Sequence, residues 1–311
     1  MPAWVFGRPS KPPPRTRDSV VVVWTLQPPI GRRAMHLNNL RDTPPWEWPA
    51  DAGKAIMKVL GDRSADAPER KLAANLAGEL VVMDDRLAEM LLSIAQDAEE
   101  PDELRARAAA SLGPVLEEAD TEGYDDDIGD PSISLLLFRR LQAALRKLHD
   151  DEHAPVLVRR RALEASVRSA EDWHADAIRA AFLRGDEGWK LTAVFCTGWI
   201  RGFDEQILEM LNSRNPAIHR EAVIAAGRQE VDAAWPHVAA LAGSAATEKS
   251  LRLAAIEAAS GIRPREAKEL LADLADSDDE EIADAVSDAM MAPEFDEDAE
   301  FEDGEDEEDD L

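Results

Sequence analysis

The stretch that decides the fold is ELRARAAASLG, at residues 103–113. Related segments occur at residues 70–78, 158–167, 189–198, 218–227, 251–260 and, more weakly, 282–290. All of these segments share one alanine column, formed by Ala73, Ala108, Ala162, Ala193, Ala222, Ala255 and Ala285. A residue that must be small in every unit marks a place where two helices approach closely. We therefore expect these alanines to lie where neighbouring repeats pack.

An amphipathic segment precedes each copy of the motif, so the repeating unit is a pair of helices. These preceding segments lie at residues 50–60, 86–95, 133–148, 173–183, 203–211, 233–241 and 265–275. Strong helix formers dominate throughout, and no segment alternates apolar and polar residues like a strand. One helix pair cannot cover its own apolar face, so successive pairs must stack. The sequence predicts an all-α solenoid of about seven helical hairpins over residues 46–291.

The two ends and one insert differ in composition from this body. Residues 1–45 are rich in proline and predict a disordered segment, with Met35 as an alternative initiator. Residues 292–311 predict a disordered acidic tail, since 294–311 hold 13 acids and no base. One interval of the alanine column, from Ala108 to Ala162, is 54 residues long. We expect its acid-rich part, residues 117–132, to form a solvated loop.

Net charge excludes two classes of partner. The chain carries a formal net charge of −29, and the body between residues 35 and 293 still carries −21. Nucleic acids and anionic membranes attract basic surfaces, so we expect neither as a partner. The run Val20–Trp24 is too short for a secretion signal or a membrane span. One cysteine cannot form an internal disulfide, and we expect a cytoplasmic protein.

No residue constellation of the sequence predicts catalysis, a cofactor or a metal. The histidines show no zinc-type spacing with cysteine. They are His36, His149, His153, His174, His219 and His237. Cys196 stands among apolar residues and is interpreted as a small buried side chain rather than a nucleophile. The acid-rich insert lacks the residue order of an EF-hand, and no glycine-rich phosphate loop occurs.

Two segments resemble the second helix of short bacterial HEAT repeats: residues 102–113, DELRARAAASLG, and residues 215–227, NPAIHREAVIAAG. The resemblance covers most of the chain and implies an α-solenoid. HEAT-repeat proteins are mainly scaffolds and adaptors, so the resemblance implies a non-enzymatic protein that binds a protein segment on its concave face. Deoxyhypusine hydroxylase, an enzyme with HEAT repeats, holds iron through His-Glu dipeptides, and this chain has none.

Two alternatives remain open at this point. Some HEAT-repeat proteins similar to this one are chromophore lyases of phycobiliproteins, although no residue here supports that activity beyond the shared fold. The acidic surface also suggests a binder of basic proteins or a mimic of nucleic acid.

A column of basic residues follows the same repeat: Arg70, Arg105, Arg159, Lys190, His219 and Arg252. Four positions earlier stand Asp66, Pro101, Pro155, Asp186, Asn215, Glu248 and Asp278. One interpretation is an anion-binding ladder. We favour a structural one, in which the earlier residues cap the second helices and the basic side chains pair with those caps.

The candidate binding residues lie on one stripe of the central second helices. They stand one position before, two positions after or six positions after the alanine of their unit. Second helices line the concave side in HEAT solenoids, so the resemblance places this stripe in a groove. The candidate protein-binding strip consists of Arg161, Arg168, Phe195, Trp199, Ile224 and Arg228. Aromatic residues at helical spacing also occur in cores, so burial of Phe195 and Trp199 is the alternative. Phe295 and Phe301, set among acids, suggest that the acidic tail docks on this strip within the same chain.

Overall fold

The computed structural model describes residues 37–124, 131–275 and 277–291, and their regular structure is entirely helical. The described helices belong to one compact unit, His36–Leu311. The first helices of the hairpins are α2 (Ala52–Gly61), α4 (Asp85–Gln96), α7 (Leu135–Asp150), α9 (Trp173–Leu183), α11 (Asp204–Met210), α13 (Trp235–Gly243) and α15 (Pro264–Leu271). The second helices are α3 (Ala67–Leu76), α5 (Asp102–Ala110), α8 (Val156–Ser166), α10 (Glu187–Thr197), α12 (Pro216–Arg228), α14 (Lys249–Ile262) and α16 (Glu280–Met290).

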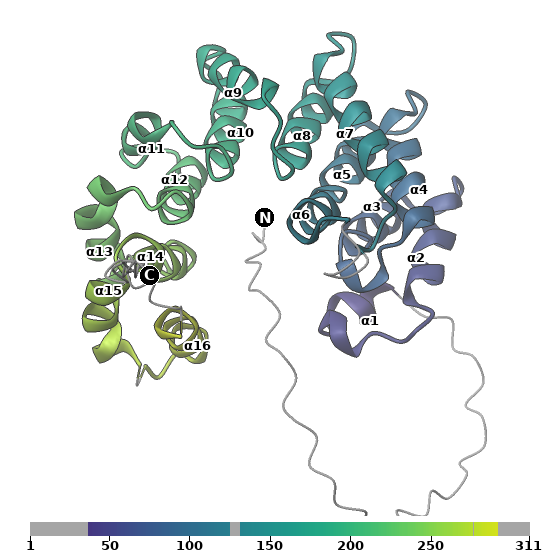
Figure 1. Cartoon of the computed structure of the whole chain (residues 1–311). Coiled ribbons are helices and arrows are strands. Elements are labelled where there is room, and N and C mark those ends of the chain that lie inside the picture. The colour runs from purple at the N-terminus through teal and green to yellow at the C-terminus, as the bar shows by residue number, and fades with distance from the viewer. Residues whose placement is uncertain (1–36, 125–130, 276, 292–311) are drawn as a thin grey trace, which may run out of the picture. The chain divides into compact units, whose positions relative to one another are not determined.

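Each hairpin packs on the next in chain order (Figure 1). Every second helix contacts its own first helix, and every second helix before α16 also contacts the second helix of the following hairpin. The prediction of an all-α solenoid of stacked helical hairpins is therefore confirmed over the described residues. None of the described helices is long and apolar enough to cross a membrane.

The alanine column lies where the sequence predicted it. Ala73, Ala108, Ala162, Ala193, Ala222 and Ala255 are each 0% exposed, and the apolar residues that follow them are also fully buried. Ala285, in the last described hairpin, is half-buried. Where α12 passes α14, Gly227 leaves room for the backbone of Ala258, and Gly261 leaves room for the backbone of Gly227. Small residues at these positions set the spacing of the stack.

Four arginines of the basic column bind the end of the preceding first helix. Each donates to a backbone carbonyl ten residues earlier: Arg70 to Leu60 (2.8 Å), Arg105 to Ala95 (3.2 Å), Arg159 to His149 (2.9 Å) and Arg252 to Ala242 (3.0 Å). The last carbonyls of a helix lack hydrogen-bond donors within the helix and carry partial negative charge. A guanidinium supplies both a hydrogen-bond donor and a positive charge. The structural interpretation holds, but the predicted pairing with the second-helix caps is wrong for these four.

The caps themselves are mostly where they were expected. The side chains of Asp186, Asn215 and Glu248 accept backbone N–H groups at the starts of α10, α12 and α14. Asp279, rather than the predicted Asp278, caps α16.

Two predicted irregular regions contain helix. In the segment predicted to be disordered up to residue 45, α1 (Leu37–Arg41) buries Leu37 and Leu40 against α2 and α3, and the 3₁₀ turn η1 (Pro45–Glu47) follows. The predicted loop 117–132 begins inside α6 (Gly113–Glu122), which packs on α7 and α8 through buried Val115 and Leu116. The predictions were wrong for residues 37–45 and 117–122, because a few apolar side chains suffice to dock a short helix. Residues 1–36, 125–130 and 292–311 lie outside the described residues.

Loss of stability in mild acid is expected from His174, which is fully buried. Its Nδ1 accepts the backbone N–H of Glu171 (2.9 Å) and its Nε2 bonds Ser166 Oγ (3.0 Å), a pattern that fits the neutral ring. Burial lowers the pKa of His174 to about 4. Below the unfolded pKa of roughly 6.5, the imidazole takes up a proton in the unfolded chain but stays neutral in the folded chain. The free energy of unfolding therefore decreases as the pH is lowered.

Between about pH 7.5 and about pH 5 this effect removes about 2 kcal/mol from the free energy of unfolding. Urea unfolding at both pH values measures it. His174→Gln should reduce the pH difference by that amount, whereas His153→Gln, at an exposed site, should leave it unchanged. Equal pH differences in both variants would remove His174 as the cause.

Candidate functional site

The predicted strip runs along three consecutive second helices, α8, α10 and α12, each of which contacts the next. Arg168 and Trp199 lie in the turns that directly follow α8 and α10. Arg228 is exposed, whereas Arg161, Arg168, Phe195, Trp199 and Ile224 are half-buried. Phe195 and Trp199 pack on the core cluster around Leu163 and Trp189, and Ile224 packs on the next cluster along the chain. Each of these apolar residues thus packs one side on the core and exposes another side at the surface. The structure therefore lies between the two interpretations, a binding strip and a buried core.

Trp199 is the centre of an aromatic and guanidinium cluster. Its ring centroid lies 4.6 Å from that of Phe195. The Cζ atoms of Arg168 and Arg228 lie 4.9 Å and 4.2 Å from the Trp199 ring centroid. Both are cation–π distances. Arg168 follows α8, Trp199 follows α10 and Arg228 is the last residue of α12, so the cluster joins the C-terminal ends of these three helices.

Two glycines make room for these arginines. A Cβ at Gly113 would lie 2.8 Å from Arg168 Cδ, and a Cβ at Gly198 would lie 3.3 Å from Arg228 Cδ. Both glycines end a copy of the sequence motif. The end of one second helix therefore receives the arginine of the next.

Glutamates neutralise part of this charge. Arg168 pairs with Glu117 of α6 (2.6 Å), and Arg161 pairs with Glu164, which is almost fully buried. Thr192 Oγ1 donates to Glu164 (2.5 Å) and accepts from Arg160 Nε (2.8 Å). Through Arg161 and Glu164, a connected polar network thus links the strip to both α8 and α10.

Like charges nevertheless remain crowded on this face. Desolvation lowers the pKa of Arg107 on α5, and the positive charge of Arg161 lowers it further. Burial likewise lowers the pKa of Arg168, the ion pair with Glu117 opposes that effect, and the charge of Arg228 adds to the lowering. Within the described residues, the side chains of Arg107 and Arg228 make no hydrogen bond or ion pair. An anion that approached this face would relieve both repulsions.

Arg107 extends the strip by one repeat, and the sequence analysis missed it. The signal was available, because Arg107 stands one position before Ala108 just as Arg161 stands one position before Ala162. The same column places Glu221 before Ala222. Desolvation raises the pKa of Glu221, and the charge of its neighbour Arg220 opposes that effect.

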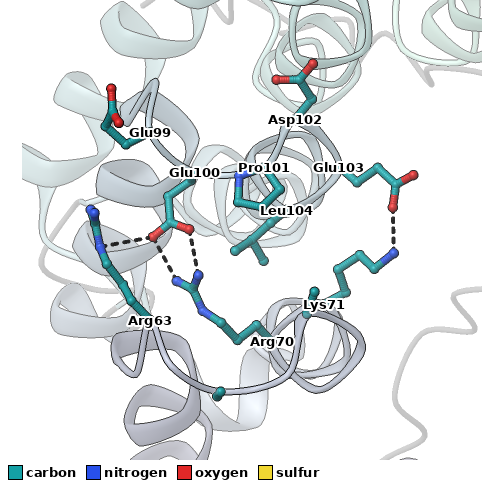
Figure 2. Close-up of a pocket in the computed structure, with 11 residues that line it drawn as sticks. Arg63, Arg70, Lys71, Glu99, Glu100, Pro101, Asp102, Glu103 and Leu104 are labelled. Atoms are coloured by element: carbon teal, nitrogen blue, oxygen red, sulfur yellow. Dashed lines mark hydrogen bonds and ion pairs between the residues drawn. The ribbon is translucent and has the colours of Figure 1, made fainter.

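A hollow of about 510 Å³ lies between the first two described hairpins (Figure 2). Arg70 makes two bonds with Glu100, at 2.6 Å and 2.9 Å, and Arg63 approaches the same carboxylate at 3.5 Å. Lys71 pairs with Glu103 across the hollow at 2.5 Å. Because each of these three basic side chains bonds a carboxylate of the next hairpin, we interpret the hollow as a polar interface between repeats.

Cys196 is fully buried, as predicted, and burial raises the pKa of its thiol well above the ordinary value. It therefore acts as a small apolar side chain in the core. The described residues contain no group of three or more histidine, cysteine, aspartate or glutamate side chains arranged to hold a metal ion.

No family model matches the sequence, and no curated protein matches it. Two solved structures are similar in fold. The Escherichia coli protein YibA aligns with 15% identity and a TM-score of 0.39, over 79% of this chain and 84% of its own. Human deoxyhypusine hydroxylase, solved with glycerol, aligns with 19% identity and a TM-score of 0.36, over 82% of this chain and 87% of its own.

The prediction of a non-enzymatic scaffold or adaptor is corrected by this comparison. One of the two similar structures is, by its name, a hydroxylase. A fold by itself does not make a chain non-enzymatic. The two alternatives, a chromophore lyase and a binder of basic proteins, gain nothing from the geometry of the strip, which is rich in arginine.

Proposed function

We propose that the strip, together with Arg107, is a recognition site for an acidic polypeptide segment that carries an aromatic side chain. The observation that supports this most directly is the crowding of guanidiniums on one face of a body that is otherwise acidic. The proposal concerns recognition, and it applies equally to a partner and to a substrate.

Charge supports the acidic character of the segment. Arg107 and Arg228 lack ion pairs within the described residues, and each faces another guanidinium, Arg161 or Arg168. Carboxylates bind guanidinium groups through paired hydrogen bonds, which adds geometric selectivity to the attraction. The body as a whole repels anions at long range, so the attraction must act at contact. At physiological ionic strength, where the screening length is about 8 Å, contact pairs persist while that repulsion is damped.

The half-buried aromatic pair supports an aromatic side chain in the ligand. Phe195 and Trp199 are anchored in the core and keep part of their surface accessible. Side chains held in place in this way lose little entropy on binding, and aromatic and arginine residues are the commonest anchors of protein recognition. The chain itself contains one segment of this chemistry, residues 294–311, with 13 acids, Phe295 and Phe301.

Binding of a labelled peptide with the sequence of residues 294–311 tests the proposal. Fluorescence anisotropy compares the full chain with a chain that ends at residue 293. If the tail docks on the strip of its own chain, the shortened chain should bind the peptide at least about tenfold more tightly, because an intramolecular competitor has been removed.

Arg228→Glu, made in the shortened chain, should weaken peptide binding by about tenfold, or about 1.4 kcal/mol. The matched control is Arg139→Glu, which makes the same charge change at an exposed arginine of α7, a first helix. Peptide binding should be nearly unchanged in the control. Equal losses in the two variants would reduce the effect to net charge, and undetectable binding to the shortened chain would refute the proposal.

A further inference from the structure

Two histidines from neighbouring hairpins meet between α12 and α13. His219 of α12 and His237 of α13 are both half-buried, and their Nε2 atoms lie 2.8 Å apart. Their ring centroids are separated by 5.1 Å and the rings are inclined by 67°. Only one hydrogen can lie between two imidazole nitrogens, so at least one of the two rings must be neutral at Nε2.

The same separation suits a divalent metal ion. Imidazole nitrogens bind such ions at about 2.0 Å. Two bonds of that length to atoms 2.8 Å apart meet at about 90°, whereas a tetrahedral site would need a separation of about 3.3 Å. An angle near 90° belongs to adjacent ligands of a square-planar or tetragonal ion, and Cu²⁺ prefers that geometry together with nitrogen ligands.

We propose that His219 and His237 form a two-histidine binding site for Cu²⁺ between α12 and α13. Both rings bind through Nε2, which requires the hydrogen now shared between them to move to Nδ1 of its ring. The two rings stay neutral, so no net proton is released at neutral pH.

The surroundings favour an exchangeable ion. Burial lowers the pKa of both rings, and the neighbouring His237 adds to the effect at His219, so the neutral forms prevail at pH 7. The described residues supply no third histidine, cysteine or carboxylate to this pair. Water therefore completes the coordination of the ion. The affinity for Cu²⁺ then comes from two imidazoles that the fold holds close together. The acidic body raises the local concentration of cations around the site.

Titration of the full chain with CuCl₂, followed by calorimetry and electron paramagnetic resonance, tests the proposal. One equivalent of Cu²⁺ should bind with a spectrum that shows hyperfine coupling to nitrogen. His219→Ala and His237→Ala should each weaken this binding by at least about tenfold, and the double variant should bind no more weakly than either single one. Loss of either ring breaks the chelate, which explains why the two effects do not add.

The matched control is His153→Ala, which removes an exposed histidine from the α7–α8 turn. It should bind Cu²⁺ as the parent chain does. Thermal unfolding without metal checks that each variant is folded, and added Cu²⁺ should raise the melting temperature of the parent chain and of the His153 variant only. Unchanged affinity in His219→Ala, or a spectrum with oxygen ligands alone, would overturn the proposal by placing the ion on the acidic groups.

Discussion

Replacing Glu100 with alanine should lower the free energy of unfolding by about 3 kcal/mol, because the change leaves Arg70 buried without its counter-charge. The side chains of both residues are only 6% exposed, and the carboxylate makes two hydrogen bonds to the guanidinium. Removal of one partner of such a pair typically costs 3–5 kcal/mol. The hollow beside the pair admits water, which places the expected cost at the lower end of that range (Figure 2).

The neighbouring Glu99 provides the matched control for this prediction. It lines the same hollow, is exposed, and makes no side-chain hydrogen bond or ion pair within the described residues. Glu99→Ala removes the same atoms and the same charge, yet it should change stability by less than about 0.5 kcal/mol. Urea unfolding of the two variants under identical conditions measures both effects. Similar losses in the two variants would show that the ion pair contributes no more than a surface charge does.

The sequence alone was sufficient to predict the solenoid because the same requirement, a small residue where neighbouring helices pack, recurs in seven segments. A single alanine such as Ala108 means little, but an alanine at the same place in every unit has one simple cause, the close passage of neighbouring helices. The segments predicted as first and second helices all contain helices, with shifts of a few residues at their ends. Periodicity also located the strip, since residues three and four apart on a helix share a face.

Features that do not repeat were harder to predict. Helix α6 lies between two hairpins and has no counterpart between the other described hairpins. Its acidic residues obscured the apolar side chains, Val115 and Leu116, that dock it. The bond between Arg168 and Glu117 depends on that helix, so the local charge balance of the strip could not be known in advance. The approach of His219 to His237 likewise depends on how two hairpins are rotated against each other. None of these contacts recurs from one described repeat to the next, so no repeating pattern in the sequence could reveal them.

The carbonyl partners of the arginine column form an intermediate case. The column of basic residues could be recognised in the sequence. Its acceptors could not, because they are backbone carbonyls near the ends of the first helices, and every residue type carries a backbone carbonyl. Sequence patterns are informative about side chains that meet side chains. They say little about side chains that meet the backbone.

Gly227→Ala should destabilise the stack by about 3 kcal/mol at the crossing of α12 and α14. A Cβ at this position would lie 2.5 Å from Ala258 Cα and 2.7 Å from its Cβ. The nearest contact is backbone, which cannot rotate away as a long side chain does, so the two helices must separate. Separation opens voids along the buried alanines Ala226 and Ala259, and lost packing outweighs the helix propensity of about 1 kcal/mol that alanine brings.

Gly243→Ala separates this packing effect from the change of residue type. Gly243 is the last residue of α13, and a Cβ there would meet only Leu270 Cδ1, at an ordinary contact distance of 3.6 Å. The control should therefore be neutral or slightly more stable than the parent chain. Hydrogen exchange should show increased opening of α12 and α14 in the Gly227 variant, since each repeat depends on its neighbours. If both variants unfold at the same urea concentration, the close passage of second helices does not hold the stack together, and the alanine column loses its explanation.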